Sequence, residues 1–315
     1  MINVLYCFDS NYNIQASVSM YSILENISEK INIYIIHKSE TDKSFLSEKI
    51  KEHKMLNSLH VYKFLNNNLN VFNIEDAHIS SATFFRIFLE DYLPNDINKI
   101  FYIDCDILCL NDPTSNLNEA INKLNESESV VAANTEEIYL KNPNFFNRIE
   151  MSGEKYFNAG VMLIDISRWI KHSIKEKSIN SIAYLRDRAV LWDQDILNHV
   201  INGNYQDLDE SLNFRTKNKV KLTNKLIFEK NLIFLHFAGA SKPWDVRGPM
   251  FEGFEEFQNI FRELNSKNYF LVVKNRRKSL KELYRVLFIF QLSKIQFKIK
   301  YLYTAVTNIM FKRYE

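Results

Sequence analysis

The sequence predicts an α/β protein with a mostly parallel sheet, and three observations lead to that class. First, apolar runs rich in Ile, Val, Tyr and Phe alternate with segments of helical spacing in the N-terminal third. This order is typical of parallel sheets with helices on both faces. Second, 46% of the 315 residues are hydrophobic, which is enough to bury a large core. Third, six glycines and five prolines are too few for a loop-rich all-β architecture.

Strands and helices alternate from the N-terminus. Residues 2–8 are apolar and end at Asp9-Ser10-Asn11, residue types that favour turns and helix caps. Beyond them, apolar residues recur at helical spacing over residues 12–26. The same reasoning predicts strands at residues 31–36, 59–64 and 99–103, helices at 44–56 and 81–89, and an Asn-rich loop at 66–73.

The remainder of the chain has a mixed pattern without an internal repeat or a low-complexity linker. It predicts strands at residues 130–133, 161–166 and 232–237 and helices at residues 177–188 and 195–201. The one shift in composition falls near Lys274. We therefore expect a globular domain over residues 1–273 and a tail over residues 274–315.

The tail is basic and amphipathic. It carries eleven lysines and arginines against two glutamates, a net charge of +9, whereas the whole chain carries +2. Basic residues alternate with bulky apolar ones over residues 280–288 and 295–311, as in helices that lie in a membrane interface. We expect the tail to bind the inner leaflet of the cell membrane, with a helical pair docked on the core as the alternative. Nucleic-acid binding is disfavoured because the basic residues form no separate patch.

The three cysteines, Cys7, Cys105 and Cys109, lie in or beside expected strands. An odd number of buried cysteines favours free thiols in a reducing compartment over a disulfide framework. The first residues run directly into a strand without a basic segment, so we expect no signal peptide. No stretch reaches the roughly eighteen apolar residues that span a bilayer. We expect a cytoplasmic protein at the membrane surface.

The strand at residues 99–103 ends on two acids, Asp104 and Asp106, in the sequence IFYIDCD. Residues i and i+2 of an extended backbone point to the same face, so both carboxylates can bind one cation. Oxygen ligands of this kind suit Mg²⁺ or Mn²⁺, especially when phosphates share the ion. The alternative is an ordinary pair of solvated acids in a turn.

His236 follows the last expected strand and precedes the segment FAGASKPW. If it faces the acid pair, it completes a metal site with three protein ligands and open positions for phosphate oxygens. Gly239 would let a ligand approach the backbone closely, and Lys242 would place a cation on a pyrophosphate. The alternatives are a structural histidine and an ordinary turn.

Three further polar groups are candidates for base or sugar contacts: Asp9, Asn11 and Tyr12 after the first strand; Asn158, Ala159 and Gly160 before the strand at residues 161–166; and Asp193, Gln194 and Asp195 at a helix start. The first group would hydrogen-bond and stack on a base, and the other two would hydrogen-bond sugar hydroxyls. Each group has a structural alternative, namely a helix cap, a turn, and acids that complement a helix dipole.

Six short blocks occur in order: CFDSNY (7–12), HISSATFFR (78–86), YIDCD (102–106), YFNAGV (156–161), WDQDILN (192–198) and HFAGASKPW (236–244). Together they resemble glycosyltransferase family 8, and they are most similar to its bacterial lipopolysaccharide and lipooligosaccharide α-galactosyl- and α-glucosyltransferases. The resemblance covers about residues 1–245. It implies a GT-A fold, a Mn²⁺ ion with Mg²⁺ as the alternative, a UDP-sugar donor, and retention of the donor's α configuration.

The resemblance also implies roles for matching positions. Asp104, Asp106 and His236 would bind the metal ion that bridges the two phosphates, and Asp104 would also contact the substrate. The other substrate contacts fall to Asp9, Asn11 and Tyr12 for the nucleoside, to Gly239 and Lys242 for the pyrophosphate, and to Arg86, Asn158, Ala159, Gly160, Asp193 and Gln194 for the sugar. Ser10 stands where relatives often carry a second aspartate, which leaves the nucleoside contacts there less defined.

We therefore expect a retaining transferase that moves galactose or glucose from UDP to a saccharide acceptor, with a lipooligosaccharide or lipopolysaccharide core sugar favoured. Asp193, Gln194 and Asp195 form the catalytic group. Retention requires either a carboxylate nucleophile, for which Asp195 is the candidate, or attack on the face from which UDP leaves. Same-face attack is favoured, with Gln194 supporting the reacting carbon, because an amide is a poor nucleophile. The alternatives are a glycogenin-like enzyme that glucosylates itself and a non-catalytic nucleotide-sugar or glycan-binding protein.

Overall fold

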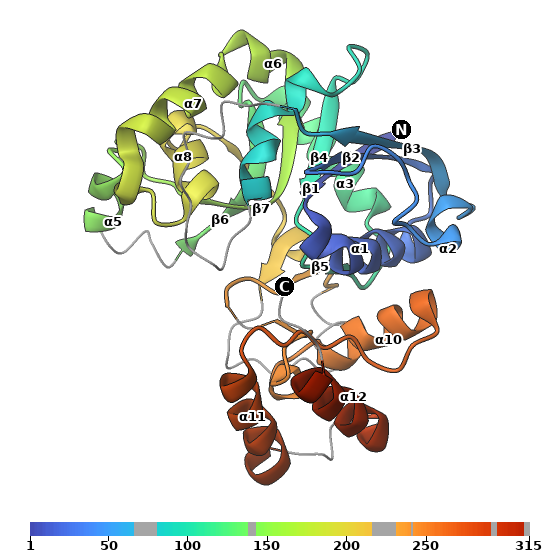
Figure 1. Ribbon diagram of the computed structural model, residues 1–315. Coiled ribbons are helices and arrows are strands. Elements are labelled where there is room, and N and C mark those ends of the chain that lie inside the picture. The colour runs from blue at the N-terminus through green and yellow to red at the C-terminus, as the bar shows by residue number, and fades with distance from the viewer. Residues whose placement is uncertain (66–80, 138–142, 216–230, 241, 291–294, 312–315) are drawn as a thin grey trace.

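A seven-stranded sheet lies at the centre of the protein, in the order β3-β2-β1-β4-β7-β6-β8 (Figure 1). The computed structural model describes residues 1–65, 81–137, 143–215, 231–240, 242–290 and 295–311. The strands of the sheet are β1 (Ile2–Phe8), β2 (Ile31–His37), β3 (Leu56–Lys63), β4 (Lys99–Ile103), β6 (Val131–Thr135), β7 (Phe157–Asp165) and β8 (Gln206–Asp207). All neighbours pair in parallel except β7, which is antiparallel to both β4 and β6. The predicted α/β class and mostly parallel sheet are confirmed.

Strand β1 shows how the sheet divides the core into two layers. Its residues Val4, Tyr6 and Phe8 face one layer, and Leu5 and Cys7 face the other, as the two-residue period of a strand requires. The first layer contains α1 (Asn13–Asn26), α2 (Glu48–Lys51), α3 (Thr114–Glu126) and α10 (Phe254–Asn265). The second contains the 3₁₀ segment η3 (Ser81–Asp91), α6 (Ile166–Lys171), α7 (Ile174–Leu185) and α8 (Trp192–Ile201).

A smaller, three-stranded sheet has the order β5-β10-β9. Strand β10 (Phe234–His236) lies between β5 (Ile107–Cys109), to which it is antiparallel, and β9 (Phe214–Arg215), to which it is parallel. Strand β5 begins four residues after β4 ends. The small sheet therefore places β9 and β10, which come about a hundred residues later in the chain, near the end of β4.

The tail packs on the segment that precedes it. Helix α12 (Lys298–Phe311) contacts α10 through the rings of Tyr301 and Phe254, and α11 (Arg276–Arg285) packs against α12. Both helices lie away from the large sheet (Figure 1). Leu283, Tyr301 and Ile309 share a hydrophobic cluster with Val246 and Leu271, and the Tyr301 hydroxyl donates to the backbone oxygen of Val246. The buried face of the tail therefore belongs to a third core.

Several elements differ from the sequence prediction. The helix expected at residues 44–56 is the single turn of α2 (Glu48–Lys51), and Leu56, the last residue of the expected helix, pairs with β2 instead. Residues 81–89 form a 3₁₀ helix rather than an α-helix. Asn158, Ala159 and Gly160 lie inside β7 and not in a turn, since Asn158 pairs with Asn134 of β6 and the Gly160 backbone oxygen accepts from the Asp104 backbone. Helix α8 begins at Trp192, three residues before the predicted start. The Asn-rich loop predicted at residues 66–73 lies outside the described residues.

All three cysteines are buried and free, as predicted. Among the helices that the structure describes, none has the length and apolar character needed to cross a membrane.

Candidate active site

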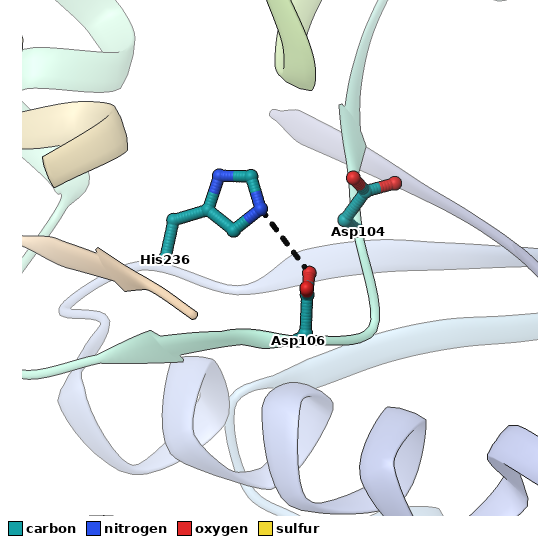
Figure 2. Close-up of side chains that lie close together, drawn as sticks. All are labelled: Asp104, Asp106 and His236. Carbon is teal, nitrogen blue, oxygen red and sulfur yellow. Dashed lines mark ion pairs between the residues drawn. The ribbon is translucent and has the colours of Figure 1, made fainter. Parts of the chain in front are cut away.

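The predicted metal ligands come from three neighbouring strand ends. Asp104 follows β4, Asp106 precedes β5, and His236 ends β10. The pairing of β10 with β5 places His236 opposite Ile107, next to Asp106. One ligand atom from each of the three side chains lies within 4.8 Å of the others, and His236 Nε2 lies 3.3 Å from Asp106 Oδ1 (Figure 2). We refer to Asp104, Asp106 and His236 as the ligand cluster.

The ligand cluster suits a divalent cation. Within the described residues, Asp106 Oδ1 is buried and accepts no hydrogen bond. A buried carboxylate oxygen in this state is costly unless a cation binds it. Carboxylates suit Mn²⁺ and Mg²⁺, and an imidazole shifts the preference toward a transition metal. The donor set therefore fits a divalent cation that accepts both carboxylate and imidazole ligands.

Lys242 supplies a positive charge beside the cluster. Its Nζ donates to Asp106 Oδ2 at 2.5 Å and to the backbone oxygen of Phe237 at 2.8 Å. Burial alone would raise the pKa of Asp106, but the Lys242 ammonium group holds that pKa well below its usual range. Asp106 is therefore ionised at neutral pH, which is the form that binds a metal ion.

Arg86 in η3 is buried and joins two acids. Its guanidinium lies 3.0 Å from both Asp104 Oδ1 and Asp193 Oδ2, and it donates to the backbone oxygen of Ala159 at 2.6 Å. The guanidinium also stacks on the ring of Tyr102, 3.9 Å from its centroid, and the Tyr102 hydroxyl donates to Asp104 Oδ1 at 2.5 Å. These contacts fix the direction of the Asp104 carboxylate.

Asp193 lies in the first turn of α8 and is only 4% exposed. The Thr83 hydroxyl donates to its Oδ1 at 2.5 Å. Burial raises the pKa of Asp193 to about 6, although Arg86 and Thr83 lower it. Arg86 connects Asp193 to Asp104 of the ligand cluster. A buried carboxyl group in this position, with its pKa raised toward neutrality, is a candidate functional group.

Gln194 lies against strand β7. Its Oε1 accepts hydrogen bonds from the Ala159 backbone at 3.0 Å and from Asn158 Nδ2 at 3.2 Å. On the other side of the same strand segment, a Cβ at Gly160 would lie 2.4 Å from His236 Cε1. The absence of a side chain at Gly160 therefore allows the imidazole to pack on the strand. Residues 158–160 connect Gln194 with the ligand cluster.

Asp195 is fully buried, with 0% of its surface exposed. Arg148 donates to both of its oxygens, at 2.8 and 3.0 Å. The Tyr156 hydroxyl and the Leu191 backbone each donate to it at 2.8 Å. Both oxygens of Asp195 thus accept hydrogen bonds from other side chains and the backbone, whereas Asp106 Oδ1 accepts none within the described residues.

The predicted nucleoside contacts lie around the end of β1. Asp9 accepts from the Asn11 backbone at 2.9 Å, which is the helix-cap geometry that was the alternative reading. Tyr12 meets Trp244 edge to face, with 6.4 Å between the ring centroids. Gly239 has φ +84° and no described atom within 4 Å of the position that a Cβ would take. Space for a ligand therefore exists at Gly239 among the described residues.

Sequence reasoning missed several residues that the site uses: Thr83, Tyr102, Glu136, Tyr156 and Asn213. Three of them lie inside the recognised blocks, but a threonine or tyrosine there is indistinguishable from an ordinary core residue. Glu136 and Asn213 lie outside every block. Nothing in their local sequence predicts that they meet Asn158 Nδ2 at 2.9 Å and His236 Nδ1 at 2.8 Å.

Comparison with known proteins decides the family. The sequence profile described as glycosyl transferase family 8 matches residues 3–247. The chain belongs to this family. Among its relatives, a putative glycosyltransferase of Haemophilus influenzae is 28% identical over 77% of this chain and 73% of its own. A lipopolysaccharide 1,2-glucosyltransferase of Escherichia coli K12 is 27% identical, and a lipopolysaccharide 1,3-galactosyltransferase of Salmonella typhimurium is 26% identical, each over 77% of this chain and 72% of its own.

A solved structure confirms the fold of this family 8 protein. The galactosyltransferase LgtC, in complex with donor and acceptor sugar analogs, superposes with a TM-score of 0.71 at 22% identity, over 88% of this chain and 99% of its own. The GT-A fold implied by the six blocks is therefore confirmed. The chain is a glycosyltransferase of family 8.

Proposed function

We propose that the protein is a retaining, metal-dependent hexosyltransferase that moves galactose or glucose from UDP to a saccharide acceptor. The observation that carries this proposal is the ligand cluster, in which Asp104, Asp106 and His236 converge beside Lys242. Two relatives act on lipopolysaccharide, one as a 1,2-glucosyltransferase and one as a 1,3-galactosyltransferase. They support a lipopolysaccharide or lipooligosaccharide core sugar as the acceptor.

The metal ion and the residues around the ligand cluster would stabilise different charges during the reaction. A bound Mn²⁺ ion would neutralise charge on the diphosphate as UDP leaves. Lys242 donates a hydrogen bond to Asp106. Its ammonium group can donate to a pyrophosphate oxygen when the nucleotide sugar binds. Arg86 keeps Asp104 and Asp193 in fixed positions, so their carboxylates need not reorganise during the reaction.

Gln194 is the group that we place at the reacting carbon. Its amide is held by Ala159 and Asn158, and the amide oxygen can support a positively charged sugar centre. Asp195 is fully buried, whereas Gln194 is partly exposed, and the Asp195 oxygens accept from Arg148 and Tyr156, which disfavours a role as nucleophile. These contacts support attack of the acceptor on the face from which UDP leaves.

The proposal is tested by measuring UDP release from UDP-galactose and UDP-glucose with Mn²⁺ and with EDTA. Turnover that requires the metal ion supports the proposal. No turnover with any nucleotide sugar contradicts it.

We also propose that residues 274–315 form a membrane-binding tail attached to a catalytic domain over residues 1–273. One face of the tail is buried in the third core, and the other is apolar and basic. Its large apolar side chains are strongly exposed, at 57% for Tyr284, 72% for Phe288 and 84% for Ile299. Lys281 and Arg285 are exposed beside Tyr284, and Lys298 and Lys300 are exposed on either side of Ile299. Exposed apolar groups bordered by cations match an anionic lipid surface.

The tail's role predicts a loss of vesicle binding when its charges are removed. Each basic residue near an anionic surface contributes about 1 kcal/mol, so R277Q/K281Q/R285Q is expected to lower affinity for phosphatidylserine vesicles about a hundredfold. The substituted side chains are exposed, so the fold and UDP release in solution should be unchanged. Vesicle sedimentation measures the binding.

The matched control removes three exposed lysines from the catalytic domain, as K38Q/K43Q/K54Q. We expect this variant to bind vesicles as well as the wild type does. Equal loss in both triple variants would show that only net charge matters, and unchanged binding by the tail variant would contradict the membrane role.

A further inference from the structure

His236 has a second partner besides Asp106. Its Nδ1 lies 2.8 Å from Asn213 Oδ1. Both side chains are buried, with 3% of His236 and 2% of Asn213 exposed. Asn213 ends the 3₁₀ segment η5 (Glu210–Asn213), far from His236 in sequence. On its other face the imidazole packs on Gly160, where a Cβ would lie 2.4 Å from the ring.

The hydrogen bonds around Asn213 fix its orientation, starting from a backbone group. The Gly160 N–H donates to Asn158 Oδ1 at 3.0 Å. A backbone N–H can only donate, so this atom of Asn158 must be the amide oxygen. Asn213 Nδ2 donates to the same oxygen at 2.9 Å. Asn213 must therefore turn its own oxygen toward His236.

An amide oxygen can only accept, so the hydrogen on the neutral imidazole lies on Nδ1. His236 Nε2 then carries a lone pair, and it faces Asp106 Oδ1 at 3.3 Å. Within the described residues that oxygen accepts no hydrogen bond, as expected when two acceptors face each other. A cation bound by both atoms satisfies them.

We propose that Asn213 is a positioning residue, which holds His236 in the Nδ1–H tautomer and keeps Nε2 ready to bind the divalent cation. Its amide is oriented in turn by the Gly160 backbone through Asn158. The inference rests on the proposed metal-dependent function for its purpose. The tautomer itself is a property of the metal-free protein.

The experiment measures the tautomer directly, by long-range ¹H–¹⁵N correlation spectra of metal-free protein labelled with ¹⁵N-histidine, at a pH that keeps the ring neutral. The H236Q spectrum identifies the signals of His236. We expect the Nδ1–H form in the wild type and in N213D, since a carboxylate also accepts from Nδ1. In N213A and N213L the acceptor is lost, and we expect the Nε2–H form to become populated.

Mn²⁺ affinity, measured by calorimetry, provides the second readout. Loss of a partner that orients a metal-binding histidine typically weakens affinity 10- to 100-fold, and we expect this in N213A and N213L. The alanine variant leaves a small cavity and the leucine variant fills it, so whichever is folded by circular dichroism gives the comparison.

The Nδ1–H form in N213A or N213L, together with Mn²⁺ affinity within twofold of the wild type, would overturn the inference. If the wild type binds no Mn²⁺, the proposed function fails. The tautomer spectra would still decide whether Asn213 sets the proton position.

Discussion

Replacing Asp106 by asparagine is expected to lower metal-dependent UDP release from a UDP-sugar by at least a hundredfold. Asp106 is the member of the ligand cluster that contacts both His236 and Lys242, and Lys242 keeps it ionised at neutral pH. Asparagine keeps the size of the side chain but removes the negative charge and one ligand oxygen. Loss of one preorganised electrostatic group typically costs about 10²- to 10³-fold in kcat. Steady-state UDP release at saturating Mn²⁺ measures the effect.

D96N is the matched control for D106N. It makes the same chemical change at an exposed aspartate in the loop before β4, and we expect kcat within twofold of the wild type. If D106N, folded by circular dichroism, retained wild-type turnover with the same Mn²⁺ dependence, the ligand cluster would not be the metal site.

Replacing Gln194 by glutamate is expected to produce the second large effect, a loss of at least a hundredfold in sugar transfer with little change in affinity for UDP. Gln194 Nε2 donates to the Tyr156 hydroxyl at 3.2 Å, and this hydroxyl donates its proton to Asp195 at 2.8 Å. A glutamate places a carboxylate where the amide donated, so two acids compete for one hydroxyl proton. The side chain is then displaced from the reacting carbon, where a small shift is costly.

Transfer kinetics and calorimetric titration with UDP separate the two parts of this prediction. Q296E, at an exposed position that accepts from Arg262, serves as the control and should behave like the wild type. Wild-type transfer by Q194E would remove Gln194 from the reaction. A hexose adduct on Asp195, detected by mass spectrometry of the wild-type enzyme during turnover, would contradict same-face attack.

The sequence was sufficient to predict the elements that have a local pattern of residues. The apolar runs of β1, β2 and β4 and the acid pair after β4 could be read directly, because a buried strand is a continuous apolar segment. The contact of His236 with Asp106 could not be derived from spacing. It depends on β5 and β10, strands of three residues each, and pairing between such short and distant segments leaves no periodic signal.

At residues 158–160 the local sequence pattern predicted the wrong structure. Asn, Ala and Gly together predict a turn, yet they continue β7, and their backbone groups orient Gln194 and Asn158.

The sequence likewise predicted the amphipathic character of the tail but not what its buried face meets. That face packs on residues such as Val246 and Leu271, and the preference of one apolar surface for another carries no local sequence pattern.

The most direct test of metal-dependent hexosyl transfer is the release of nucleoside diphosphate, UDP or GDP, from a panel of nucleotide sugars. UDP-galactose, UDP-glucose, UDP-N-acetylglucosamine and GDP-mannose would each be incubated with purified protein in Mn²⁺, in Mg²⁺ and in EDTA. We predict slow release from UDP-galactose or UDP-glucose with Mn²⁺, weaker release with Mg²⁺, and none with EDTA. Release that continues undiminished in EDTA, or the absence of both turnover and Mn²⁺-dependent UDP binding, would contradict the proposed chemistry of Asp104, Asp106 and His236.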